Sequence, residues 1–391
     1  MLSHSARIPL SFPMLVSGFV AVLVGYSSSA AIIFQAAQAA GATPAQIGGW
    51  LSMLGIAMGI ASLGLSLWTR MPILCAWSTP GAALLATSLH GLTLNEAVGV
   101  FIFANALIVL SGVTGLFARL MNLIPPALAS GMLAGILLRF GLEAFGGLAQ
   151  DFALCGAMCL AWLLARRWTP RYAILIVLLV GVATALARHA IHFPAADTGF
   201  ALPQGIMPRF SLTALLGVGL PFFLVTMASQ NAPGVATLQA HGYRPPVSAL
   251  MSWTGAIALL LSPFGGFSVC VAAITAAICM GEEVDPSPRR RWMAAALAGV
   301  FYLLAGLSGA LIATLFVALP PPLITTLAGL ALLSTLSGSL TRALAEPETR
   351  DTAIITFLIT ATGLSLLGLG AAFWGLVGGA FAHLLLTRRA P

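Results

Sequence analysis

Long runs of apolar residues follow one another along almost the whole chain, and only short polar gaps separate them. Charged residues make up 7% of the chain, whereas roughly a quarter would be charged in a soluble protein. Such a chain cannot cover a globular surface with water-compatible groups, so we expect it to lie in a lipid bilayer. Since a spanning helix needs about 20 apolar residues, the chain has room for about fourteen spans and no sizeable soluble domain.

The predicted fold class is therefore an all-α polytopic membrane protein with fourteen transmembrane segments. The apolar runs cover residues 11–38, 45–68, 71–89, 95–118, 124–147, 152–165, 172–187, 211–232, 246–263, 267–280, 292–319, 321–341, 352–368 and 370–387. The runs 152–165 and 172–187 are short for a bilayer, which leaves the number of spans open by two.

The positions of the basic residues predict the orientation of the chain. All 17 of them are arginines, and cytoplasmic connections collect arginine during insertion. With fourteen spans and a cytoplasmic N-terminus, only Arg139, Arg188 and Arg209 fall outside cytoplasmic segments, so both termini are predicted to be cytoplasmic. The arginines form no continuous stripe, which argues against a nucleic-acid partner. The five cysteines lack the paired spacing of a zinc site, so we expect no metal and no cofactor.

An internal repeat divides the chain near residues 189–210. Three similar segments recur in the same order after about 190 to 200 residues: 38–44 as 239–245, 77–83 as 267–273 and 133–138 as 327–332. With seven spans in each half, the second copy enters the membrane from the opposite side. Inverted repeats are typical of secondary transporters, whose substrate site lies near the midplane where interrupted helices meet.

Two runs contain such interruptions, in spans 3 and 10. Ser78 precedes Thr79-Pro80-Gly81 in mid-run, and serine before a proline in the first turn is a preferred helix start. We therefore expect a short extended segment and then a half-helix. In the second repeat, Ser268 is expected to cap a half-helix that runs to about Met280. The two N-terminal ends would form an anion site without a cationic side chain. The alternative is that both breaks are kinks that serve packing.

A second polar cluster lies in the first and eighth runs. Tyr26 and Ser28 lie in the first run, and Gln230 and Asn231 lie in the eighth. Polar groups at membrane depth are costly unless they are paired, so they point to partners or to a ligand. The alternative is that they only hold helices together.

Three segments carry a family resemblance: 76–82 (AWSTPGA), 229–235 (SQNAPGV) and 262–266 (SPFGG). They resemble the BenE-type benzoate:proton symporters of bacterial inner membranes, and the hydropathy likeness covers essentially the whole chain. The wider fold group, shared with nucleobase and sulfate-type transporters, implies seven-plus-seven inverted repeats. By this resemblance, the core domain comprises residues 1–120 (spans 1–4) and 193–319 (spans 8–11). The gate domain comprises residues 121–192 (spans 5–7) and 320–391 (spans 12–14).

The resemblance implies a secondary active transporter that imports benzoate or a close aromatic carboxylate with protons by alternating access. We expect the amides after Thr79 and Ser268 to hold the carboxylate, polar side chains to direct it and aromatic rings to flank its ring. The candidate substrate residues are Tyr26, Ser28, Trp77, Ser78, Thr79, Gln230, Asn231, Phe267 and Ser268. A nucleobase transporter, an inorganic-anion transporter and a channel of the same fold stay open as alternatives. An enzyme is not expected, because no nucleophile with a general base is found at membrane depth.

The path of the proton is less defined. Nucleobase relatives place acidic residues on spans 8 and 10, but the matching positions here carry no carboxylate. Glu143 is the acidic residue expected at membrane depth and is the candidate for proton coupling. Its alternative role, which the spacing favours, is a structural pair with Arg139 one turn earlier. The sequence leaves the oligomeric state open, and a homodimer is compatible with it.

Overall fold

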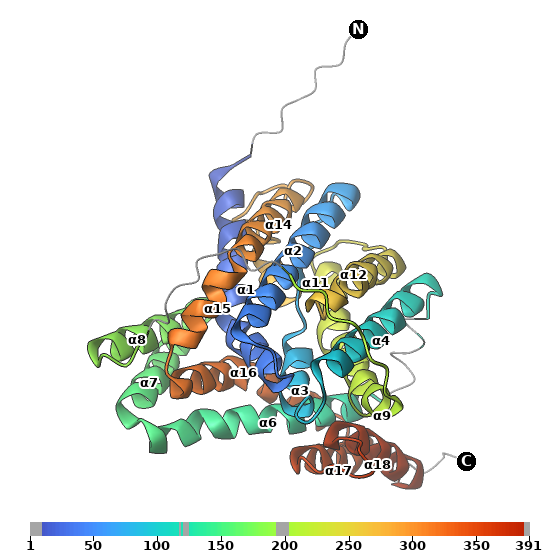
Figure 1. Ribbon diagram of the computed structural model, residues 1–391. Coiled ribbons are helices and arrows are strands. Elements are labelled where there is room, and N and C mark those ends of the chain that lie inside the picture. The colour runs from blue at the N-terminus through green and yellow to red at the C-terminus, as the bar shows by residue number, and fades with distance from the viewer. Residues whose placement is uncertain (1–9, 117–118, 120–124, 193–202, 387–391) are drawn as a thin grey trace.

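The computed structural model describes residues 10–116, 119, 125–192 and 203–386, and these are almost entirely helical (Figure 1). The predicted cytoplasmic ends, 1–9 and 387–391, lie outside the described residues, as does part of the midpoint connector, 193–202. The helical content confirms the predicted fold class. The elements of the first half are α1 (Phe12–Ala39), α2 (Pro44–Thr69), β1 (Cys75–Ala76), α3 (Thr79–Ser88), α4 (Leu94–Val113), α6 (Pro126–Gln150), α7 (Phe152–Trp168), η1 (Pro170–Tyr172) and α8 (Ala173–Ala187).

The second half contains more interruptions than the first. Its elements are α9 (Leu212–Ala214), η2 (Leu215–Gly219), α10 (Leu220–Thr226), η3 (Met227–Asn231), α11 (Ala232–Ala240), α12 (Val247–Leu261), η4 (Ser262–Phe264), β2 (Cys270–Val271), α13 (Ile274–Ile278), α14 (Trp292–Leu307), α15 (Gly309–Ala318), α16 (Pro321–Ala343), η5 (Pro347–Thr349), α17 (Arg350–Ala361) and α18 (Ala371–Leu386).

Eight helical segments of the described chain are long and apolar enough to cross a membrane, or nine if the pair α14 and α15, bent by 63°, is one span. Each of the fourteen predicted runs contains a helix. That all fourteen cross the bilayer stays a prediction.

A small antiparallel sheet joins the two halves at the centre of the molecule. β1 pairs with β2 in the register Cys75 to Val271 and Ala76 to Cys270. The Ala272 N–H continues the pairing with the Leu74 carbonyl at 2.9 Å. These strands are the short extended segments predicted in spans 3 and 10. Unpaired backbone at membrane depth is tolerated only inside protein, and here each segment satisfies the other.

The predicted start of the second half-helix is wrong. The helix does not begin after Ser268 but at Ile274, with Ala273 as its N-cap, and it has only 5 residues. The physical reason is that the backbone of residues 270–272 pairs with the first repeat instead. Val269 and Val271 are β-branched and suit an extended chain, and the strand pairing satisfies backbone groups that a helix would otherwise satisfy.

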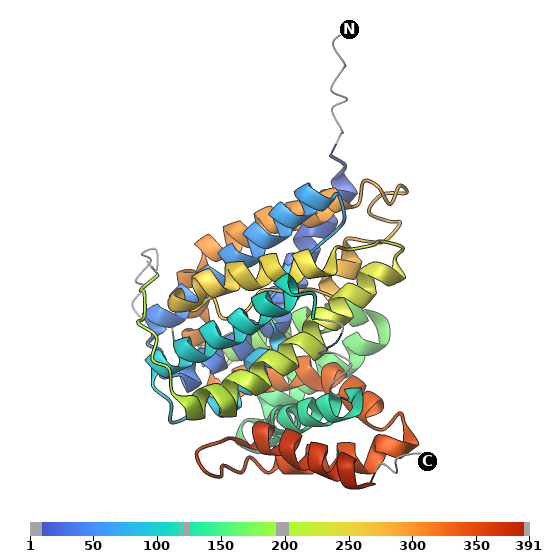
Figure 2. The same ribbon diagram turned by 90° about the vertical axis from the view of Figure 1, so that its right-hand side faces the viewer.

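The helices form two groups of contacts. In one group, α2 packs against α14 and α15, α4 packs against α12, and α1 packs against α3 and α14. In the other, α6 packs against α16 and α17, α7 against α8, and α17 against α18. Figure 2 shows α17 and α18, in red, at the lower edge of the molecule, with α6 above them. That these groups are the predicted core and gate domains, and that they move against each other, stays a prediction.

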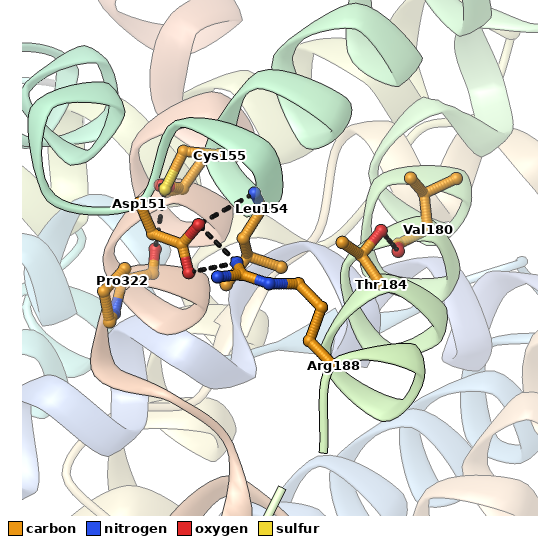
Figure 3. A network of polar contacts seen from close by, with 8 residues as sticks. Asp151, Leu154, Cys155, Val180, Thr184, Arg188 and Pro322 are labelled. Atoms are coloured by element: carbon orange, nitrogen blue, oxygen red, sulfur yellow. Dashed lines mark hydrogen bonds and ion pairs between the residues drawn. The ribbon is translucent and has the colours of Figure 1, made fainter. Parts of the chain in front are cut away.

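One ion pair fastens the α7–α8 hairpin. Asp151 is the N-cap of α7, where its Oδ1 accepts a hydrogen bond from the Leu154 N–H at 3.1 Å. Arg188, at the end of α8, donates to both carboxylate oxygens, with 2.6 Å to Oδ2 (Figure 3). The hydrogen bond from Arg188, followed by the one from Leu154, holds the pKa of the Asp151 carboxyl below its usual range.

We expect Asp151→Ala to destabilise the protein by about 1 kcal/mol through the lost cap. Asp151→Asn keeps the cap acceptor and loses only the charge. Because the folded-state pKa is lowered, the stabilisation by the charge is present above the unfolded-state pKa of about 3.9 and is lost as pH falls through the folded value. In detergent at neutral pH, the melting temperature of the wild-type protein should therefore be higher than that of Asp151→Asn. This difference in melting temperature should vanish in acid. A difference that persisted in acid would contradict this.

Candidate substrate site

The start of α3 is held by hydrogen bonds from three directions. The Ser78 hydroxyl caps the helix by accepting from the Gly81 N–H at 3.0 Å, and Thr226 of α10 donates to the same oxygen at 3.2 Å. The Ser78 N–H donates to the Ser268 hydroxyl at 2.8 Å. Ser78 and Ser268 are both fully buried. The predicted cap of α3 is therefore confirmed, and Ser268 positions it from the other repeat.

Glycine is required in this first turn because α3 approaches α10 closely. A Cβ on Gly81 would lie 2.6 Å from the Phe222 ring and 2.9 Å from the Thr226 hydroxyl oxygen. Phe222 is fully buried, so it has no open space to move into. The small residue thus fixes where the N-terminal amides of α3 lie.

The eighth run is irregular at the residues that the sequence singled out. Met227–Asn231 form a π-helical turn, η3, just before Pro233. Proline cannot donate to the carbonyl four residues earlier, here that of Ser229, which favours such a local widening. π-turns recur at functional sites because they redirect side chains without ending a helix.

Asn231 ties this turn to the strand of span 10. Its Oδ1 accepts from the Val271 N–H at 3.0 Å, and its Nδ2 contacts the Met227 sulfur at 3.3 Å. The side chain is fully buried. Gly234, one turn on, lies so close to the Val271 carbonyl that a Cβ would overlap it. Asn231 therefore positions β2.

The aromatic candidates divide into two environments. Trp77 and Tyr26 lie edge to face, with ring centroids 4.8 Å apart, and the Trp77 indole N–H donates to Ser29 at 2.6 Å. The Tyr26 hydroxyl is buried without a hydrogen-bond partner among the described residues. Phe267 is instead enclosed by other core rings, those of Trp50, Phe101 and Phe222. Ser29 belongs to the polar cluster of the first run but is not among the predicted substrate residues, although it neighbours Ser28.

Four candidates are half-buried: Tyr26, Ser28, Thr79 and Gln230. The Ser28 hydroxyl donates to the Gly25 carbonyl at 3.1 Å, whereas the Gln230 amide makes no hydrogen bond to another described residue. The elements that carry Thr79 and Gln230, α3 and η3, both pack against α6. Gln230 therefore has donor and acceptor capacity to spare at the boundary between the two helix groups.

The electrostatics of this junction depend on the backbone. Among the described residues, the buried charged side chains are Asp285 and Arg291, and Arg291 is bonded to the carbonyls of Asp285 and Met280. The N-terminus of α3 is therefore the source of positive potential, through its helix dipole and the Thr79 N–H, which has no acceptor among the described residues. α13 contributes less than expected, because it is short and the Val271 and Ala272 amides ahead of it already have acceptors.

A cavity of about 230 Å³ lies at the other end of α3. It is lined by Gln35, Gln38, Ala39, Ala86, Thr87, His90, Arg139, Phe140, Glu143 and Thr325. None of the nine predicted substrate residues lines it, but Glu143 does. The predicted pair is confirmed, with Arg139 Nε 2.8 Å from Glu143 Oε1. Within the described ranges, no three His, Cys, Asp or Glu side chains are arranged to hold a metal ion.

Sequence comparisons place this architecture among known transport proteins. The profile of the family described as "BenE: Benzoate membrane transport protein" matches residues 9–385. The chain is 57% identical to the "Inner membrane protein YdcO" of Escherichia coli K12 over 96% of each chain. It is 38% identical to the "Benzoate membrane transport protein" of Acinetobacter baylyi over 95% of each chain.

Solved structures share the fold at low sequence identity. SLC26A9 superposes with a TM-score of 0.66 at 13% identity, covering 95% of this chain and 65% of that one. The transmembrane domain of the cyanobacterial bicarbonate transporter BicA superposes with a TM-score of 0.63 at 14% identity, covering 94% and 97%. The likeness extends over nearly the whole chain, including both helix groups.

Proposed function

Because this chain belongs to the benzoate membrane transport protein family, we propose that it imports benzoate or a close aromatic carboxylate together with protons by alternating access. The family and its apolar helices make it a multi-pass membrane transport protein. The relative from Acinetobacter baylyi, 38% identical, bears a name that states benzoate transport. The relative named as an inner membrane protein supports a bacterial inner membrane, with both termini cytoplasmic as the arginines predict.

The observation that carries the proposal is the capped N-terminus of α3 at an uncharged junction. A carboxylate there would accept from the Thr79 N–H, because Pro80 has no N–H and the Gly81 and Ala82 amides already donate to Ser78. The positive end of the helix dipole would add to this attraction. Gln230, which is half-buried and has no partner among the described residues, would donate to it. Trp77 and Tyr26 would flank the aromatic ring, and Ser28 would lie beside them. Asn231, Ser78 and Ser268 hold the frame of this site through the hydrogen bonds above. Phe267 would support it from the core.

The two groups of helices supply the moving parts. In this proposal, the group of α1–α4 and α9–α15 is the core and the group of α6–α8 and α16–α18 is the gate. The substrate lies between α3 and η3 on one side and α6 on the other, where the groups meet. Sliding of one group against the other would expose the site to each side in turn.

A competition assay tests the substrate. Proteoliposomes that hold the full chain are given radiolabelled benzoate, with and without an acid-outside pH gradient, against unlabelled uracil, sulfate and substituted benzoates. We expect benzoate to accumulate only with the gradient and substituted benzoates alone to compete. Uptake insensitive to the gradient would instead indicate a channel, and failure of benzoate to accumulate would overturn the substrate.

An inorganic anion is the second candidate. The murine SLC26A9 anion transporter and the cyanobacterial bicarbonate transporter BicA are both chains of this fold. The helix N-terminus of α3 would serve a small anion equally well, but the Trp77–Tyr26 pair favours a flat ring. Competition by sulfate or bicarbonate, with none by substituted benzoates, would favour this alternative.

A further inference from the structure

The cavity at the far end of α3, which we call the outer cavity, lies between the two helix groups. Its walls are the last turns of α1 and α3 on one side, and the middle of α6 with the start of α16 on the other. Figure 1 shows α16 below α1 and beside α3, with α6 passing beneath them. By the predicted topology, this is the periplasmic half of the protein. The cavity therefore opens along the boundary that alternating access would use.

The ion pair in its wall is unusual for its depth. Arg139 lies near the middle of α6, about 16 Å along the helix from its end at Gln150. The Arg139 side chain is 62% exposed and the Glu143 side chain is 41% exposed. Charged side chains at such depth are costly against lipid and face water-filled cavities. Both line the outer cavity, which accounts for their position.

The rest of the wall offers what a small aromatic anion needs. Gln35 lines the cavity, and its Nε2 has no hydrogen-bond acceptor in the part of the chain that the structure describes. Phe140, Ala39 and Ala86 supply apolar surface beside the polar groups. Cavities for drug-sized ligands begin near 300 Å³, so a cavity of about 230 Å³ fits a smaller molecule.

We propose that the outer cavity is a second binding site for the aromatic carboxylate, in which the substrate replaces Glu143 on Arg139 and the released Glu143 takes up a proton. This inference rests on the proposed function. The exchange is balanced: the Arg139–Glu143 pair, a carboxylate anion and a proton give an Arg139–carboxylate pair and a neutral Glu143. One proton thus accompanies one carboxylate without an acidic side chain at the central junction.

Few other titratable groups face Glu143. In the cavity wall they are Arg139 on α6 and His90 after α3, while α1 contributes Gln35 and Gln38 and α16 contributes Thr325. At the end of α6, Asp151 is already bonded to Arg188. The other acidic, basic or histidine side chains on helices packed against α6 do not line the cavity: Arg166 and Arg167 on α7, Arg342 on α16, Arg350 and Asp351 on α17, and His383 on α18.

Three variants in proteoliposomes test the exchange. Glu143→Gln imitates the protonated side chain, so benzoate uptake should persist but lose its stimulation by an acid-outside gradient. Arg139→Gln should raise the half-saturating benzoate concentration about tenfold, as expected for a lost charged hydrogen bond. The double variant should keep this raised concentration. Arg167→Gln, an exposed arginine at the end of α7 and outside the cavity, is the matched control and should behave as wild type.

The outcomes separate the proposals. If the double variant regains the wild-type half-saturation, or if Glu143→Gln keeps its gradient dependence, the pair is only structural and the exchange is wrong. If wild type takes up no benzoate, the proposed function itself fails. If a variant is not monodisperse, the exchange is tested on the wild-type protein instead. When benzoate is added to the protein in weak buffer, the pH change should correspond to uptake of one proton per carboxylate bound. Binding without proton uptake would overturn the exchange.

Discussion

Replacing Gly265 by alanine is expected to remove most of the folded protein. Gly265 follows η4 with φ of 87°, and a Cβ there would overlap the indole ring of Trp50. Trp50 is 1% exposed and packs on Phe101, so it cannot move aside. The left-handed backbone costs about 1 to 2 kcal/mol for alanine, and overpacking adds about 1 to 3 kcal/mol. The yield of monodisperse protein and its melting temperature measure the effect.

The chain offers a matched control for the backbone part of this effect. Gly242 has φ of 83°, and nothing lies within 4 Å of the position of its Cβ. Gly242→Ala should therefore lose only the smaller, conformational part and leave folded protein. Equal losses in the two variants would mean that the Trp50 contact contributes nothing.

Asn231→Ala should have the second largest effect, on both stability and transport. The Val271 N–H would lose its acceptor in a fully buried place, at a cost of about 1 to 3 kcal/mol. Because β2 meets β1 just before α3, the tip of α3 should then shift. We expect benzoate uptake in proteoliposomes to fall about tenfold or more, since each 1.36 kcal/mol corresponds to a factor of ten in rate.

Gln230→Ala provides the comparison. Gln230 is half-buried and makes no hydrogen bond to another described residue, so its loss should leave the melting temperature unchanged. Uptake should still fall, because a substrate contact is lost. A wild-type melting temperature for Asn231→Ala would show that Asn231 does not hold β2, and unchanged uptake by Gln230→Ala would remove Gln230 from the site.

The sequence predicted those features that depend on local chemistry. Ser78 and Pro80 determine where α3 begins because capping and the missing proline N–H act within one turn. The extended segment before α3 and the Arg139–Glu143 pair follow from similarly short spacings. The start of the second half-helix could not be predicted in this way. There, pairing with a strand almost 200 residues away decides the structure, and Ser268 serves as a cap in neither repeat.

The outer cavity also escaped prediction, for a related reason. Its wall combines the ends of α1 and α3 with the middle of α6, and no spacing within any one helix reveals that meeting. A signal was present in Arg139, an arginine well inside an apolar run. The spacing to Glu143 accounted for a charged residue at that position by pairing the two side chains. It did not reveal the cavity that both side chains face.

The β1–β2 pairing has a consequence for how the protein can move. The Ser78 N–H donates to the Ser268 hydroxyl, and the Ala272 N–H donates to the Leu74 carbonyl. These hydrogen bonds connect the interrupted span of one repeat to that of the other. Separating the two spans would break these hydrogen bonds inside the protein at membrane depth, where water cannot replace the lost partners. In the proposed alternating-access cycle, we therefore expect the two paired spans to move together as one rigid unit. A disulfide between them should leave transport intact, whereas one from α3 to α6 should arrest it.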